Sequence, residues 1–136
     1  MAVALTMVAC SERPVGAAVT DTPRGEWLAG ASVEVRYENC DTLSLYDVAV
    51  VVRREASATE VAMPLRVRCT SPSGVTFESG VVVPEESHRG GSFTESVGAW
   101  IDGAHFAESG EYLFTFTPES DLRGVWSVGV ELKVEN

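Results

Sequence analysis

The chain has 136 residues, 45% of them hydrophobic, and a formal net charge of -10 from 20 acidic and 10 basic residues. Lys133 is the one lysine among the basic residues. A nucleic-acid partner is therefore disfavoured, because phosphate binding relies on clustered lysine and arginine. The length suits a single domain, which buries about two-thirds of the surface that its unfolded chain exposes.

The first ten residues have the pattern that bacterial lipoprotein processing recognises. An apolar run from Ala2 to Ala9 ends at Cys10, so that a small residue directly precedes the cysteine. Lipoprotein processing attaches a diacylglyceryl group to such a thiol, and the mature chain then begins at the lipidated cysteine. The alternative is an ordinary first strand or buried segment, and the run is too short to span a bilayer, which takes roughly 20 residues.

We therefore expect a signal peptide over residues 1–9 and a lipidated Cys10 that begins a tether over residues 10–30. The segment from Ser11 to Gly25 is rich in proline, alanine and threonine, as tethers often are.

After the tether, alternating apolar and polar residues predict a strand over 33–38, followed by a turn over 39–42. A nearly continuous apolar run over 43–54 is typical of a central strand in a packed sheet. Residues 55–63 predict a loop. Alternation over 65–69, a Ser-Pro-Ser-Gly turn over 71–74 and a second run over 75–83 predict a hairpin.

The pattern weakens over residues 84–106, which predicts a long loop with one short element near Val97 and Trp100. Residues 111–118 then place Tyr112, Phe114 and Phe116 on one face of a strand. A polar turn over 119–124 precedes the clearest alternation in the chain, at 126–134, which predicts a strand with Trp126 in the core.

The fold class follows from the number and type of these elements. No window has sustained helical spacing, so we expect at most a helical turn near 119–122. Six or more short strands separated by turn signals predict an all-β protein. We expect a single antiparallel β-sandwich, Ig-like or jelly-roll-like, over residues 31–136.

With Cys10 assigned to lipid, Cys40 and Cys69 are the candidates for a disulfide in an exported, oxidising compartment. Two free thiols agree equally well with the sequence, because pairing requires Cα atoms less than about 7 Å apart. Neither cysteine has another cysteine or a histidine at ligand spacing. We therefore expect no metal and no cofactor.

The candidate catalytic residues are few. His88 and His105 are the two histidines, and no Gly-x-Ser-x-Gly motif accompanies them. The carboxylate pairs Glu85 with Glu86 and Glu108 with Glu111 would need to converge to about 5–10 Å for glycoside hydrolysis. Their loop positions favour solvated charges, so we expect a protein that is not an enzyme. A small hydrolase would require these groups to meet in one pocket.

Two tryptophans are candidate contacts for a partner or a ligand. Trp27 and Trp100 lie in segments that we predict to be loops, and exposed aromatic rings in loops bind sugars or partner proteins. The alternative interpretation, which we favour, is that both rings close the open ends of the sandwich.

Several segments together resemble the GldH gliding-motility lipoproteins. These are the lipobox at Cys10, the short tether to the Pro-Arg-Gly-Glu-Trp stretch at 23–27, and the strand at 32–37. The C-terminal part carries most of the match: Phe-Ala-Glu-Ser-Gly-Glu-Tyr-Leu-Phe at 106–114 is similar to that family's penultimate strand. Leu-Arg-Gly-Val-Trp-Ser-Val-Gly-Val at 122–130 resembles its closing strand, whereas residues 85–104 depart from the family pattern.

The resemblance implies an outer-membrane lipoprotein anchored through Cys10. The sequence leaves the leaflet open, and we expect the domain to face the periplasm. Such a protein would contact envelope proteins of a gliding or secretion assembly and would have no catalytic residues. The alternative is a surface carbohydrate-binding module of a polysaccharide-uptake system, which predicts that Trp27 or Trp100 forms an exposed platform.

Overall fold

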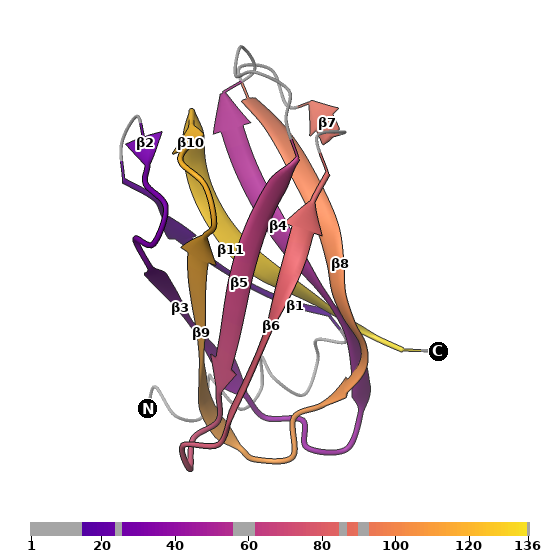
Figure 1. Ribbon diagram of the computed structural model, residues 1–136. Helices are drawn as coiled ribbons and strands as arrows, with labels where there is room; N and C mark the ends of the chain where they lie inside the picture. The colour runs from indigo at the N-terminus through magenta and orange to yellow at the C-terminus, as the bar shows by residue number, and fades with distance from the viewer. Residues whose placement is uncertain (1–14, 24–25, 56–61, 85–86, 90–92, 136) are drawn as a thin grey trace, which may run out of the picture.

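In the computed structural model, the described residues 15–23, 26–55, 62–84, 87–89 and 93–135 form strands and loops but no helix (Figure 1). The strands are β1 (Val15–Asp21), β2 (Glu26–Trp27), β3 (Val33–Asn39), β4 (Leu45–Glu55), β5 (Met63–Thr70), β6 (Thr76–Val83), β7 (Ser87–Arg89), β8 (Phe93–His105), β9 (Gly110–Pro118), β10 (Leu122–Arg123) and β11 (Val125–Val134).

Two antiparallel sheets pack face to face. One has the order β1-β11-β4-β8-β7, and the other has the order β3-β9-β5-β6 and lies in front of it in Figure 1. The short strands β2 and β10 pair with each other beside the sandwich. The predicted all-β sandwich with antiparallel strands is therefore confirmed.

The core lies between the two sheets and follows the alternation of the strands. Tyr112, Phe114 and Phe116 all point inward from β9, as their spacing predicts. From the five-stranded sheet, β4 and β11 contribute alternate buried valines and leucine, namely Val48, Val50, Val52, Val128, Val130 and Leu132. Each such side chain contributes about 1.5–3 kcal/mol when fully removed from water.

Glycines allow the sheets to approach each other at both edges. On one side, a Cβ at Gly16 of β1 would lie 2.9 Å from the ring of Tyr37 on β3. On the other side, a Cβ at Gly98 of β8 would lie 3.1 Å from the Cα atom of Val83 on β6. Both positions face the neighbouring sheet, so any side chain there would force the edges apart.

Three predictions about the elements are wrong. The expected tether over 10–30 contains β1, which pairs with β11 over its whole length, so the sandwich begins before residue 31. The expected loop over 84–106 is largely β8, the longest strand, whose bulges interrupt the alternation. The expected helical turn at 119–122 is absent, and Leu122 instead begins β10. Most of the predicted loop over 55–63 lies outside the described residues.

Trp126 is also misplaced by the sequence pattern. A register shift between Val125 and Ser127 marks a bulge in β11, which reverses the order of inward and outward side chains. Val125 therefore points into the core, and Trp126 lies 40% exposed, with its ring 5.8 Å from that of Phe93.

We predict that Gly129→Ala destabilises the sandwich by at least about 2 kcal/mol. A Cβ at this position of β11 would meet the carbonyl oxygen of Ala18 and lie 2.9 Å from the Cα atom of Val19, both backbone atoms of β1. Gly80→Ala is the matched control, because the nearest atom to its Cβ is 3.8 Å away. Urea unfolding measures both variants, and equal midpoints would contradict the prediction.

Candidate functional site

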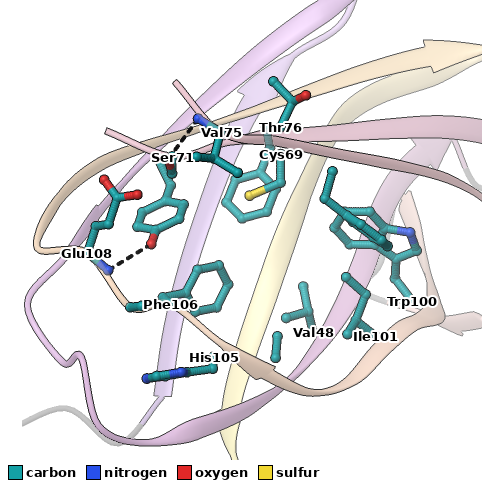
Figure 2. A pocket seen from close by; sticks show the side chains of 15 residues that line it. Val48, Cys69, Ser71, Val75, Thr76, Trp100, Ile101, His105, Phe106 and Glu108 are labelled. Carbon is teal, nitrogen blue, oxygen red and sulfur yellow. Dashed lines mark hydrogen bonds between the residues drawn. The ribbon is translucent and has the colours of Figure 1, made fainter. Parts of the chain in front are cut away.

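A cavity of about 390 Å³ opens at the end of the sandwich where β6 begins and β8 ends. Its walls come from both sheets, as Figure 2 shows for Val48, Cys69, Trp100 and Phe106. The side chains that line it are mostly apolar and aromatic. Its volume falls within the range of about 300–1,000 Å³ that is typical of ligand pockets.

Bulges in β8 bring Trp100 and its neighbour Ile101 to the cavity together. The β4–β8 register moves from Ile101 opposite Val48 to Ala99 opposite Ala49, so Trp100 is the extra residue. A second irregularity follows at Gly103, which has a φ of +73° and donates its N–H to Asp47 Oδ1 at 3.2 Å. Bulges re-aim side chains in this way, and here two successive large residues face the same cavity.

The Trp100 ring is held in place by polar and aromatic contacts. Its Nε1 donates a hydrogen bond of 2.7 Å to Ser79 Oγ on β6, which links the two sheets across the gap. Its ring centroid lies 5.9 Å from that of Phe77 and 6.4 Å from that of Phe114. Trp100 is thus a fixed part of the cavity wall.

Phe77 shows that the cavity is open to solvent. It lies opposite Cys69 in the β5–β6 register, and side chains of paired residues share one face of a sheet. Phe77 therefore belongs to the inner face, yet 53% of it is exposed. Val75, in the turn before β6, lies beside it on the rim and is 67% exposed.

The polar groups at the rim are engaged in hydrogen bonds. The Glu108 carboxylate accepts bonds from Ser73 N at 2.9 Å and Ser73 Oγ at 2.7 Å, and the hydroxyl bond holds the pKa of Glu108 below its usual value. The backbone N–H of Glu108 donates to the Tyr112 hydroxyl at 3.1 Å (Figure 2). His105 Nε2 lies 2.7 Å from the carbonyl oxygen of Thr42.

Cys69 faces the cavity from β5 as a free thiol (Figure 2). Burial raises its pKa to about 12, because the apolar surroundings disfavour the thiolate. The predicted Cys40–Cys69 disulfide does not form, and neither does the alternative of two free thiols, because Cys40 is disulfide-bonded and Cys69 is not its partner. The lipidation predicted at Cys10 lies outside the described residues.

Of the two candidate tryptophans, the structure brings only Trp100 to a cavity. Trp27 is completely buried, and its Nε1 donates to the carbonyl oxygen of Ala31 at 2.6 Å, so it closes one part of the core and offers no platform. This outcome matches the interpretation that we favoured for Trp27. Trp100 is half-buried and combines both roles, since it packs on Phe114 and lines the cavity.

The candidate catalytic residues do not converge where the structure describes them. Glu108 binds Ser73, whereas Glu111 forms an ion pair of 2.9 Å with Arg36 on the outer face. The side chains of Glu85, Glu86 and His88 lie outside the described residues. Within the described part of the chain, no three metal-ligating side chains gather, and no helix has the length and hydropathy to cross a membrane.

Sequence reasoning missed the aromatic residues that shape the cavity. The ring of Phe106 packs against those of Tyr112 and Tyr46, with ring-centroid distances of 4.9 and 5.9 Å. Phe77 lies at the rim of the cavity. Phe77 stands in the predicted hairpin, and its odd-numbered alternation with Ser79 and Val81 places it on the inner face. That alternation predicts the face of the sheet on which Phe77 lies. It does not predict the exposure of Phe77, which depends on the distance between β6 and β8.

No protein-family model and no curated protein matches the sequence. Among solved structures, a carbohydrate-binding module specific for non-crystalline cellulose is 13% identical over 87% of this chain and 80% of that chain, with a TM-score of 0.47. A Bacillus thuringiensis Cry1Da tryptic core variant is 14% identical over 81% of this chain but 17% of that chain, with a TM-score of 0.47. FLHE is 17% identical over 90% of this chain and 98% of that chain, with a TM-score of 0.39. These are likenesses of strand arrangement.

We predict that Cys69 reacts slowly with iodoacetamide in the native protein and that the rate rises about tenfold per pH unit up to its raised pKa. At pH 8 the native rate should be at least about a hundredfold below the rate in urea, where the thiol regains its ordinary pKa. Mass spectrometry of the peptide that contains Cys69 measures both rates, with Cys69→Ser as the control. Equal rates in the two states would show that the thiol is not buried.

Proposed function

We propose that this protein is a non-enzymatic, lipid-anchored adaptor that contacts other envelope proteins of a gliding or secretion assembly at the outer membrane. The lipobox pattern at Cys10 and the resemblance to the GldH lipoproteins support the location and the assembly. The single observation that carries the contact function is the open apolar cavity between β6 and β8.

The composition of the cavity favours binding by contact. An aromatic side chain on the inner face, Phe77, remains half exposed, and so does the rim residue Val75. When a partner covers exposed apolar surface in a concave site, that surface is removed from water. This burial contributes about 25 cal/mol of favourable binding free energy per Å². A domain that leaves such residues uncovered therefore has a surface suited to an apolar partner.

The polar groups around the cavity also favour binding over catalysis. A general acid or base must be able to exchange a proton with a substrate, with its pKa near the working pH. Glu108 instead has a lowered pKa and is bound by Ser73, and His105 is engaged with the Thr42 carbonyl. These groups stabilise the loops that form the rim.

Carbohydrate binding is the second candidate function, and the Phe77–Trp100 pair at the cavity is the observation that favours it. Aromatic rings bind the apolar faces of sugars. The planes of the Phe77 and Trp100 rings, however, are tilted by 46° to each other, so the pair does not form a flat platform. The Trp100 Nε1 donor is already used by Ser79. Sugar hydroxyls would therefore find few free partners in this cavity.

We predict that metabolic labelling with an alkyne fatty acid modifies the wild-type protein and that Cys10→Ser abolishes both the label and recovery in the membrane fraction. The thiol of Cys10 is the attachment point that the lipobox pattern predicts. The control is Cys69→Ser, which leaves labelling unchanged. Because Cys40 is disulfide-bonded and Cys69 is free, the decisive contrary result is a Cys10–Cys40 disulfide in peptide mapping, which would exclude lipid on the Cys10 thiol and contradict the anchor.

We predict that chemical crosslinking of the anchored protein in its native envelope captures components of a gliding or secretion assembly. A lipid anchor confines the protein to the membrane, so weak contacts suffice at high local concentration. Mass spectrometry identifies the captured proteins, and Cys10→Ser is the control for dependence on the anchor. Capture of glycan-uptake proteins, with the Trp100 side shielded by added polysaccharide, would instead favour the carbohydrate-binding alternative.

A further inference from the structure

The free edge of β6 lies beside the mouth of the cavity. β6 is the last strand of its sheet, and among the described residues it pairs with β5 alone. Its register with β5 is continuous from Thr76 to Val83, but β8 approaches it at Ser79 and at Val82 and Val83, so the open part of the edge is its start, Thr76 to Glu78. A regular edge strand presents a row of backbone donors and acceptors that another extended chain can pair with.

The opposite side of the mouth is less suited to such pairing. There β8 carries the two register shifts around Trp100 and Gly103, and bulges disrupt the hydrogen-bonding row of an edge. β7 covers β8 only at residues 94–96 in the described part of the chain. The site therefore has one regular strand edge, at β6, and one irregular aromatic wall, at β8.

We propose that an extended peptide segment of a partner protein adds to the free edge of β6 and inserts an apolar side chain into the cavity beside Phe77 and Trp100. The inference rests on the proposed adaptor function and specifies its partner. An extended peptide satisfies both features of the site, because its backbone pairs with the edge while alternate side chains point into the cavity. An acyl chain or a sugar would fill only the cavity and leave the edge in water.

The charges around the mouth specify the sequence that flanks the inserted side chain. Glu108 lines the cavity, and the exposed Asp102 follows the lining residue Ile101. Neither carboxylate forms an ion pair within the described part of the chain. A partner segment with basic residues beside its apolar anchor complements this charge.

The test is to pan a phage-displayed random peptide library against the full chain purified in detergent. Enriched peptides should alternate apolar and polar residues and carry lysine or arginine at one flank. Synthetic versions N-methylated on the set of alternate amides that faces the strand edge should bind at least about tenfold more weakly, whereas methylation of the other set should leave binding unchanged. Failure to enrich peptides, or binding that is unchanged by N-methylation of the first set and also by N-methylation of the second, would overturn the proposal.

Two variants of the protein place the binding at this site. Phe77→Lys introduces a charge at the mouth and should weaken peptide binding at least about tenfold. Val82→Lys adds the same charge on the same strand, but on the outer face where Val82 is 61% exposed, and should leave binding intact. Ala104→Met fills the cavity from β8 and is the second test if Phe77→Lys does not fold.

The same variants separate this inference from the adaptor function. If native crosslinking captures envelope proteins equally well with Phe77→Lys, the adaptor function stands and the β6 site is overturned. Sedimentation that shows a dimer dissociated by Phe77→Lys would also overturn it, because the occupant would then be a second copy of this chain. Loss of both crosslinking and peptide binding in Phe77→Lys, with both retained in Val82→Lys, supports the proposal.

Discussion

The contact between β6 and β8 at Gly98 determines how the two sheets meet on this side of the sandwich. A Cβ at Gly98 would lie 3.1 Å from Val83 Cα and 3.2 Å from the carbonyl oxygen of Val82, so glycine is needed for the approach. From this point towards the start of β6, the Trp100–Ser79 hydrogen bond is the next link between the strands. Beyond that bond the walls part and enclose the cavity, so its position depends on one glycine and one tryptophan.

This arrangement explains why large aromatic residues gather at one end of the protein. Where the sheets are close, the core is filled by valines, as at Val50, Val52 and Val83. Where the sheets part, Phe106 and Tyr112 meet edge to face at 4.9 Å and fill the wider space. This aromatic packing does not cover Phe77, which lies on the inner face of its sheet but remains exposed to solvent. This end of the sandwich is therefore suited to binding.

The apolar pattern along the chain predicts most of the long strands. Tyr112, Phe114 and Phe116 lie on the face that their spacing indicates, and the continuous apolar run over 43–54 is the central strand β4. The pattern fails where a bulge reverses the faces, at Trp126 and around Trp100, because register depends on the neighbouring strand. It also fails at β1, whose small residues, such as Gly16 against Tyr37, are needed for close packing but carry no strong strand signal. The cavity could not be predicted, because its size depends on the separation of strands that are distant in sequence.

Because β1 begins at Val15, a lipid anchor at Cys10 would lie close in sequence to the folded domain. Only residues 11–14 separate Cys10 from Val15, and a chain extends by at most about 3.6 Å per residue. Lipidation at Cys10 would therefore hold the edge strand β1 within roughly 20 Å of the lipid attachment, instead of at the end of a tether of about twenty residues. A domain held so closely meets partners near the membrane surface and explores a small volume, which raises the effective concentration of the cavity for them. If Cys10 carries lipid as proposed, this short connection would favour contact with membrane-associated proteins over capture of partners far from the bilayer.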